Sequence, residues 1–412
     1  MVDQGVSIAP RRVHYAWTVA FAGAAAMVCG LGLARFAFGM MLPSMSASLG
    51  LSYGQGGVLG FANMAGYLIA ILLAPLVLPR IGTRIAVTAN LVLIALSMLG
   101  MAATESFSAL CALYVVTGIG SGGVVLPAMS VMAQWFFPSH RGLAAGLVMS
   151  GPGFGIILSG FIVPRLAPAY GLLSWQLGWA IFALICAAVA VLAFTLIRNH
   201  PDTKGHLPFG KAPATPPGSS PMSRSAKLRL LVHMGVIFAI YGAVYMLYVT
   251  FIVTSMVDTF SLGEALAGDL WAWFGFLSIF SGILFGVVSD RIGRRRGMAV
   301  AFSVLAVSFL SVGFGPWMPG LYVSIILFGL AAWSIPVIMA ASAGDFFGSA
   351  AAANALAALT FAFSGGQATG PVLAGFLAER TGDFSASYAL SGAAAVLAIG
   401  LSLLLKTPDA SK

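Results

Sequence analysis

Twelve long apolar stretches occupy most of the sequence and constrain its fold more than any other feature. A membrane-spanning helix needs about 20 apolar residues to cross a hydrocarbon layer of roughly 30 Å. Inside that layer only helices and closed barrels satisfy their backbone polar groups, and barrel strands alternate in polarity, which these stretches do not. The sequence therefore predicts an all-α integral membrane protein with 12 transmembrane helices, near residues 15–42, 56–79, 85–104, 108–134, 142–165, 176–198, 231–257, 266–288, 297–315, 319–344, 351–378 and 386–405.

Composition excludes an ordinary soluble enzyme. Hydrophobic residues make up 60% of the chain and charged residues only 8%, whereas a soluble domain carries about 25% charged residues. The three cysteines, Cys29, Cys111 and Cys186, lie within apolar stretches without a CxxC spacing, so we expect neither a disulfide framework nor a metal site. We expect no enzymatic activity and no cofactor.

The distribution of basic residues predicts the orientation. The net charge is +9, and all but three of the 20 Lys and Arg residues fall on one side of the predicted spans, the exceptions being Arg35, Arg165 and Arg380. Positive charge is retained on the cytoplasmic side of membrane proteins. We therefore expect both termini in the cytoplasm and a multi-pass protein of the bacterial-type inner (plasma) membrane. Because the charge has this topological cause, the bilayer is the expected partner and nucleic acid is not.

A polar segment divides the chain into two similar halves. Residues 199–230 are rich in Pro, Gly, Ser and Lys and predict a flexible cytoplasmic linker between six-helix bundles at 1–198 and 231–412. RIGTR at 80–84 matches RIGRR at 291–295, an offset of about 210 that other short matches share. Repeated halves are typical of secondary transporters, whose substrate site lies near the midplane between them. The fold class predicted is thus two pseudo-symmetric six-helix bundles.

The loop after the eighth predicted span carries the most specific motif. Residues 286–295 read GVVSDRIGRR, which resembles the loop motif of the major facilitator superfamily. The resemblance covers essentially the whole chain and implies that this loop locks the two halves in one state and releases them in another. By that resemblance Asp290, Arg291, Gly293 and Arg294 are gating candidates. The alternative is that these basic residues serve only to fix the topology.

Two branches of the superfamily are similar to this chain. The stretch GLARFA at 32–37 resembles the YbfB/YjiJ-like branch, and the general plan resembles the monocarboxylate and oxalate/formate exchangers. Those exchangers have basic residues on the eighth and eleventh spans, but Trp271–Phe285 and Ala351–Ala378 contain no Lys or Arg. The resemblance therefore implies a carrier and does not define its substrate class.

Arg35 is the one charge well inside an apolar span. It precedes Pro43 by eight residues, which is about 12 Å of helix. A charge near the bilayer centre costs roughly 2.5–3.5 kcal/mol or more, so we expect Arg35 to face a water-filled cavity, where its planar guanidinium suits a carboxylate. The alternatives are a structural arginine bonded to backbone carbonyls, or one that snorkels outward.

The internal repeat predicts what faces Arg35. The offset places Met246 opposite it, and Tyr241, Tyr245 and Tyr248 share one face of the same helix. Their hydroxyls could hold a carboxylate, or they could form a packing stripe. Further binding candidates lie near the middles of other spans, although each of these alone is more often a packing residue: Asn63, Trp333, Phe361 and Gln367.

The sequence leaves the driving force open. No Asp or Glu lies in the middle of a predicted span, and Asp269, near the outer mouth of the eighth, is the best candidate for proton coupling. Exchange, facilitated diffusion and proton symport are all compatible with this pattern. We expect transport of a small organic anion, with a monocarboxylate favoured, by exchange or proton symport. The alternative is an efflux antiporter for hydrophobic or drug-like solutes, because the glycine-rich fifth span resembles an antiporter motif.

Overall fold

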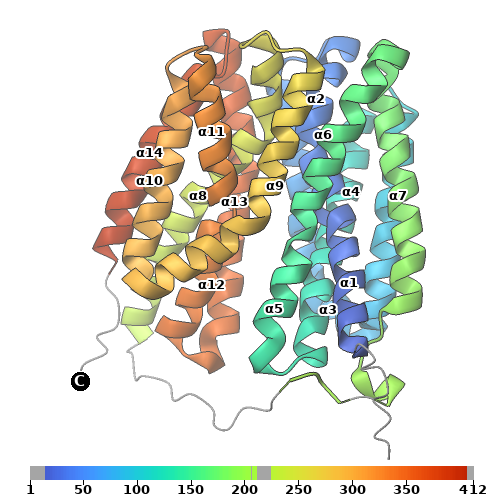
Figure 1. The fold of residues 1–412 in the computed structure, drawn as a ribbon, viewed down its shortest axis with the longest axis vertical. Coiled ribbons are helices and arrows are strands. Elements are labelled where there is room, and N and C mark those ends of the chain that lie inside the picture. The colour runs from blue at the N-terminus through green and yellow to red at the C-terminus, as the bar shows by residue number, and fades with distance from the viewer. Residues whose placement is uncertain (1–13, 206, 211–223, 406–412) are drawn as a thin grey trace, which may run out of the picture.

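The computed structural model describes residues 14–205, 207–210 and 224–405, nearly all of them in helices (Figure 1). The first half contains α1 (Tyr15–Met27), η1 (Val28–Phe36), α2 (Ala37–Leu49), α3 (Tyr53–Ala102), α4 (Phe107–Trp135), α5 (Pro138–Met149), α6 (Gly151–Tyr170), η2 (Gly171–Leu173), α7 (Ser174–Leu196) and η3 (Pro201–Lys204). The second half contains α8 (Arg224–Asp258), α9 (Glu264–Ile292), α10 (Arg294–Gly313), α11 (Met318–Ala331), α12 (Ser334–Phe347), α13 (Ser349–Thr381) and α14 (Ser385–Leu404).

The predicted fold class is confirmed, whereas the count of twelve spans stays a prediction. Ten helical segments within the described residues are long and apolar enough to cross a membrane. One of them, α3, has 50 residues and departs from helical geometry at Gly82, and α13, with 33 residues, is not among the ten. A divided α3 together with α13 would supply the remaining two spans. The predicted termini and residues 211–223 of the predicted linker lie outside the described residues.

Two glycines bear out the internal repeat in backbone geometry. Gly82 has φ 73° and ψ 163°, and Gly293, its counterpart in the second half, has φ 87° and ψ 153°. L-amino acids with a side chain rarely adopt such positive φ values, because the Cβ atom clashes with the backbone. Both glycines therefore interrupt the helical backbone in the same way.

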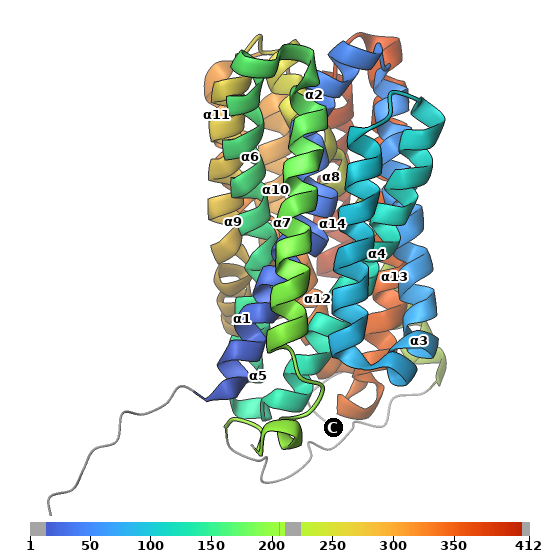
Figure 2. The same ribbon diagram turned by 90° about the vertical axis from the view of Figure 1, so that its right-hand side faces the viewer.

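The helices form two side-by-side groups, α1–α7 and α8–α14 (Figure 1), and both groups run the full height of the molecule (Figure 2). We call the end where α1 begins and α7 ends the basic end. There the Tyr15 hydroxyl donates to the Leu196 carbonyl at 2.8 Å. In the second half the Arg295 guanidinium donates to the carbonyl of Leu403, near the end of α14.

Polar contacts close the opposite end between the two halves. The Tyr53 hydroxyl donates to the Asp258 carboxylate at 3.0 Å, and the Gly54 N–H donates to the Glu379 carboxylate at 2.9 Å. Hydrogen bonds from Ser52 and from the Gly54 N–H hold the pKa of the exposed Glu379 carboxyl below its usual value. At the basic end, a side chain added at Gly142 or Gly344 would meet open space.

Ser52 stands in a GLSYG pentapeptide at 50–54, a GxSxG spacing also found around nucleophilic serines. Here the serine has a local structural role. Its hydroxyl accepts from the Gln55 N–H, and the Gln55 side chain accepts from the Ser52 N–H, which forms a capping box at the start of α3.

Candidate substrate site

Arg35 lies between the two halves and is only 3% exposed. Its Nη2 donates to the Gln367 Oε1 at 2.7 Å and lies 2.6 Å from the Met64 sulfur and 3.8 Å from the Met246 sulfur. Met64 belongs to the first half, and Met246 and Gln367 belong to the second. The expected juxtaposition of Arg35 and Met246 is therefore present, and the predicted Gln367 contacts the guanidinium directly.

The charge of Arg35 has no acidic partner among the described residues. It is the only buried charged side chain in the part of the chain that the structure describes. Its Nε is also buried and has no hydrogen-bond partner among those residues. The guanidinium neither points into lipid nor pairs with an internal acid, so both its charge and one donor remain open to a ligand.

A π-helix positions this arginine. Residues 28–36 form η1, in which backbone hydrogen bonds skip one residue further than in an α-helix. Side chains of two neighbouring helices bond to carbonyls of the same stretch. The Asn63 amide donates to the Ala34 carbonyl at 3.3 Å, the Tyr114 hydroxyl to the Arg35 carbonyl at 3.4 Å, and the Ser121 hydroxyl to the Gly30 carbonyl.

The predicted Asn63 therefore supports the main chain that carries Arg35. Its amide nitrogen is bonded to backbone carbonyls, at Ala34 and also at Tyr114. Its Oδ1 is buried without a partner among the described residues. Asn63 thus combines a positioning contact with an acceptor that a ligand could use.

Aromatic rings surround the guanidinium. Its Cζ lies 5.0 Å from the centre of the Tyr67 ring and 5.7 Å from that of Phe36. Phe36 in turn contacts Tyr245 and the predicted Trp333, with ring centres 6.1 and 5.8 Å away. Such rings stabilise a cation through their π faces and offer an apolar surface to the body of a ligand.

The three predicted tyrosines divide into one candidate ligand and two packing residues. The Tyr241 hydroxyl donates to the Ala332 carbonyl, and the Tyr248 hydroxyl is 2.8 Å from the Ser324 hydroxyl. Both hydroxyls are therefore already bonded to neighbouring helices. The Tyr245 hydroxyl is buried and has no hydrogen-bond partner among the described residues, which leaves it as the one of the three available to a substrate.

Two other candidates lie away from Arg35. Phe361 is 61% exposed, and at 100° per residue it is turned by about 120° from Gln367 on the same helix. Asp269 is exposed on α9 and lines a groove on the outer surface with Trp273 and Phe276. Neither belongs to the buried group around Arg35, so the structure does not support their assigned roles as substrate ligand and proton carrier.

Sequence reasoning missed Met64, whose sulfur contacts the guanidinium. Met246, which also contacts it through sulfur, was identified by the repeat only as the residue opposite Arg35. Met64 carries no sequence pattern that separates it from an ordinary packing residue.

The predicted gating loop forms an ion-pair cluster within the second half. Arg294 donates to the carboxylate of Asp290, one turn earlier in sequence, and its Nε donates to Asp345 on α12 at 2.7 Å. Its Nη1 also lies 2.8 Å from the Ser289 hydroxyl. Hydrogen bonds to the two acids raise the pKa of Arg294 above its usual value against the opposing effect of partial burial. Asp290 and Arg294, two of the gating candidates, thus form an ion pair, while Arg291 is exposed.

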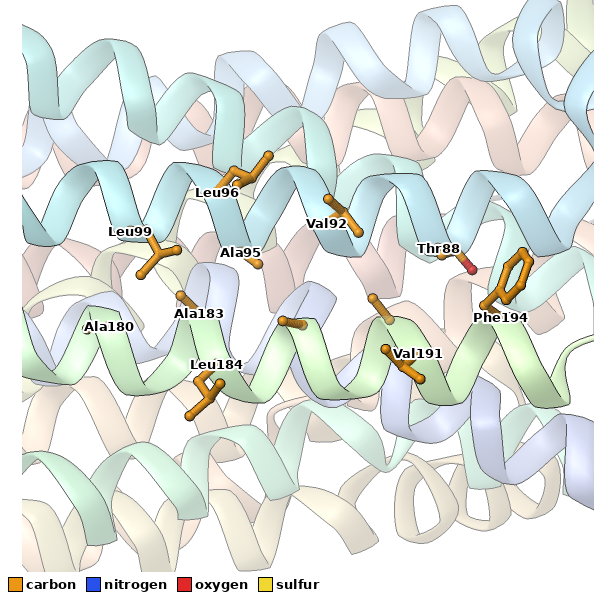
Figure 3. Close-up of a pocket in the computed structure, with 12 residues that line it drawn as sticks. Thr88, Val92, Ala95, Leu96, Leu99, Ala180, Ala183, Leu184, Val191 and Phe194 are labelled. Carbon is orange, nitrogen blue, oxygen red and sulfur yellow. The ribbon is translucent and has the colours of Figure 1, made fainter.

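A second groove on the surface is separate from this site. It has a volume of about 500 Å³ and lies between α3 and α7, lined by apolar side chains and Thr88 (Figure 3). Several of these residues are exposed hydrophobics, among them Leu96, Leu184 and Val191. The groove therefore lies on the outer face of the first half, where a membrane protein meets lipid.

Residues 27–403 match the family described as "Uncharacterised MFS-type transporter YbfB". The chain belongs to this family of major facilitator transporters. It is a multi-pass membrane transporter and not an enzyme, and the resemblance of its loop motif and of the GLARFA stretch to this group is confirmed.

Individual relatives support the assignment. The chain is 24% identical over 381 residues to the hexuronate transporter of Bacillus subtilis, and the alignment covers 89% of each protein. It is 25% identical over 326 residues to monocarboxylate transporter 12 of Xenopus laevis, covering 68% of this chain and 64% of that one. The solved structure of a D-xylose-proton symporter is similar in fold, with a TM-score of 0.74 at 15% identity, covering 97% of this chain and 99% of that one.

Proposed function

We propose that this transporter carries a small organic anion, with a monocarboxylate as the favoured substrate, and that Arg35 binds the anionic group. Transport would proceed by alternating access, in which the two halves rock about the central site. The proposal rests on one observation above all: a buried guanidinium between the halves whose charge no described acid neutralises.

The cost of burying Arg35 supports this role. A charged side chain at membrane depth costs roughly 2.5–3.5 kcal/mol on insertion scales. Gln367 and two methionine sulfurs are neutral and offset only part of that cost. A carboxylate that enters the site would supply the missing negative charge and accept from the unpartnered Nε, in the planar geometry that guanidinium and carboxylate share.

Charge balance favours one carboxylate over two. The site contains a single cation, and the open hydroxyl of Tyr245 adds a neutral donor. A second carboxylate would be buried beside Phe36 and Trp333 without a counter-charge, which is unfavourable. The names of two relatives, a hexuronate transporter and a monocarboxylate transporter, denote carboxylates as well.

The coupling mode follows from the same charge. Within the described residues no Asp or Glu is buried near Arg35, so we propose anion exchange, or symport in which the proton travels with the substrate carboxylate. The basic end would face the cytoplasm by the distribution of Lys and Arg, with both termini on that side. Because Asp269 is exposed on α9, the proposed route does not include it.

One observation favours the alternative of an efflux antiporter for hydrophobic solutes. Aromatic rings of Phe36, Tyr67, Tyr245 and Trp333 surround the site, and such a lining also suits drug-like molecules. The two functions differ in whether a negative charge on the solute is required.

Three solutes of nearly equal size test that requirement: benzoate, benzamide and benzylamine carry the same ring with negative, zero and positive charge. We expect benzoate to raise the unfolding temperature of the purified transporter, since a ligand that binds only the folded state stabilises it. We also expect benzoate to compete with uptake of a radiolabelled monocarboxylate into proteoliposomes, while the other two do not. Equal effects of all three would refute the anion proposal and support the efflux alternative.

A further inference from the structure

The helices α6 and α9 join the two halves along a tight seam (Figures 1 and 2). A Cβ atom at Gly160 would lie 2.5 Å from the Gly268 carbonyl oxygen, and one at Gly268 would lie 2.5 Å from that of Gly160. Because side chains are absent at these positions, the two backbones approach closely. The Trp271 indole N–H also donates across the seam to the Ser159 hydroxyl at 3.0 Å.

A groove of about 360 Å³ runs beside this seam on the outer surface. Its lining residues are Ile157 from α6 and Asp269, Ala272, Trp273 and Phe276 from α9. Asp269, Trp273 and Phe276 are spaced i, i+4 and i+7, so they share one helix face. Trp273 is 59% exposed and Phe276 is 45% exposed. The groove is thus an aromatic surface with one carboxylate, open to the surroundings.

A cation lies on the other side of the seam. Arg165 is exposed on the same face of α6 as Ile157 and Phe161, at spacings of four residues. Its guanidinium stacks on the Phe161 ring, with Cζ 3.4 Å from the ring centre. Among the described residues Asp269 forms no salt bridge with Arg165 or any other cation. The carboxylate and the guanidinium therefore stand apart, one on each helix.

Both charges lie within two turns of the helix ends opposite the basic end. Asp269 follows the first residue of α9 by five positions, and Arg165 precedes the last residue of α6 by five, which corresponds to about 7.5 Å along each helix. Exposed tryptophan is typical of the headgroup level of a bilayer, and Trp273 is one turn deeper than Asp269. The groove therefore opens where lipid headgroups are found.

We propose that this groove binds the headgroup of a zwitterionic aminophospholipid. The primary ammonium donates to the Asp269 carboxylate beside the Trp273 ring, and the phosphate lies toward Arg165. A choline headgroup has no N–H to donate, and an anionic glycerol headgroup is repelled by Asp269. A lipid in this position contacts both halves and so stabilises the state in which α6 and α9 have this approach.

Quenching of Trp273 by brominated lipids tests the proposal without any transport assay. The purified transporter is reconstituted in phosphatidylcholine vesicles with the same minor fraction of brominated phosphatidylethanolamine, phosphatidylcholine or phosphatidylglycerol. The difference between the wild type and Trp273→Phe isolates this residue from the other tryptophans. We expect phosphatidylethanolamine to bind about two to five times more strongly than the other two lipids, as for one exposed charged pair.

Variants of one acid identify the cause of the preference. Asp269→Asn should abolish the preference for phosphatidylethanolamine, Asp269→Glu should retain part of it, and Glu264→Gln, the matched control on the same helix, should leave it unchanged. The unfolding temperature of each variant shows whether it is folded. Equal quenching by phosphatidylethanolamine and phosphatidylcholine, stronger quenching by phosphatidylglycerol, or a preference that survives in folded Asp269→Asn would overturn the proposal.

Discussion

Two arginines of this chain are held in opposite ways. Arg294, at the basic end, donates to the carboxylates of Asp290 and Asp345 and is neutralised by the protein itself. Arg35, between the halves, is bonded to the neutral Gln367 and to methionine sulfur, with its Nε unpartnered among the described residues. A residue whose charge is already compensated can connect helices, whereas one whose charge is open can bind an anion.

The surroundings of the two arginines sharpen this difference. Asp290 and Asp345 are more than half exposed, so water shares the cost of their charges and each pair contributes little to stability alone. Arg35 is removed from water, where an ion pair is stronger because the dielectric constant is lower. The guanidinium of Arg294 therefore connects α9, α10 and α12, whereas that of Arg35 is suited to select a ligand by its charge.

Removal of the central charge should have the largest effect. We expect Arg35→Ala to weaken anion binding by roughly 100-fold, because two charge-assisted hydrogen bonds are lost, and Arg35→Lys to retain part of the affinity as a point charge. The measurement is the ligand concentration needed to raise the unfolding temperature. Arg380→Ala removes an exposed arginine near the end of α13 and should leave binding unchanged. Wild-type affinity in Arg35→Ala would remove this residue from the site.

A single substitution should give Arg35 an acidic partner within the protein, as Arg294 has. Gln367→Glu places a carboxylate where the amide oxygen now lies 2.7 Å from Nη2, so the protein itself would compensate the charge. We expect anion affinity to fall about tenfold or more, since the substrate must displace an internal ion pair. Gln367→Met is the neutral control and should cost less, about the value of one hydrogen bond.

The two variants are compared by their anion affinity. A lower affinity in Gln367→Glu than in Gln367→Met would show that charge decides binding. Equal losses would show that Gln367 acts only through its shape or its own contact with substrate, and the contrast between the two arginines would then not explain selectivity.

At the basic end, loss of one acid should change turnover and leave binding intact. Asp290→Asn removes one of the two partners of Arg294, and the remaining partner, Asp345, then carries the connection alone. We expect the exchange rate in proteoliposomes to fall about three- to tenfold, which corresponds to the 1 kcal/mol scale of exposed ion pairs, with an unchanged ligand-induced rise in unfolding temperature. Glu105→Gln, an exposed acid in the α3–α4 loop, is the control. Wild-type exchange in Asp290→Asn would leave the loop with a topological role only.

The sequence predicted the fold class because long apolar stretches allow only helices in a bilayer. It also predicted which residues could oppose Arg35, because the offset between the halves leads directly to Met246, 3.8 Å away. Gln367 was a candidate for a different reason, as a polar residue in the middle of an apolar span, and it contacts the guanidinium. The fold class and the position of Met246 depend on hydrophobic length and symmetry, which are properties of the sequence itself.

Side-chain direction was the part that the sequence could not supply. Tyr241, Tyr245 and Tyr248 are equivalent by spacing, yet two of them bond to Ala332 and Ser324 of the neighbouring α11 segment, a distinction made by tertiary packing. Phe361 and Asp269 occupy exposed helix faces away from Arg35, which spacing alone did not indicate, and their assigned roles stay predictions. The π-helix around Arg35 has no local signature either, since it depends on carbonyl partners from other helices.

The smallest effect is expected from loss of a hydrogen bond that holds the backbone at Arg35. The Tyr114 hydroxyl donates to the Arg35 carbonyl at 3.4 Å, and Tyr388 makes a comparable buried bond to the Ser255 hydroxyl at 2.8 Å, away from Arg35. Each Tyr→Phe change should lower the free energy of unfolding by about 1 kcal/mol. We expect only Tyr114→Phe to weaken anion affinity as well, by about two- to fivefold, because only this bond orients the arginine. Equal affinities in the two variants would mean that η1 holds Arg35 in place without Tyr114, and the open arginine would then owe its position to Asn63, Ser121 and packing alone.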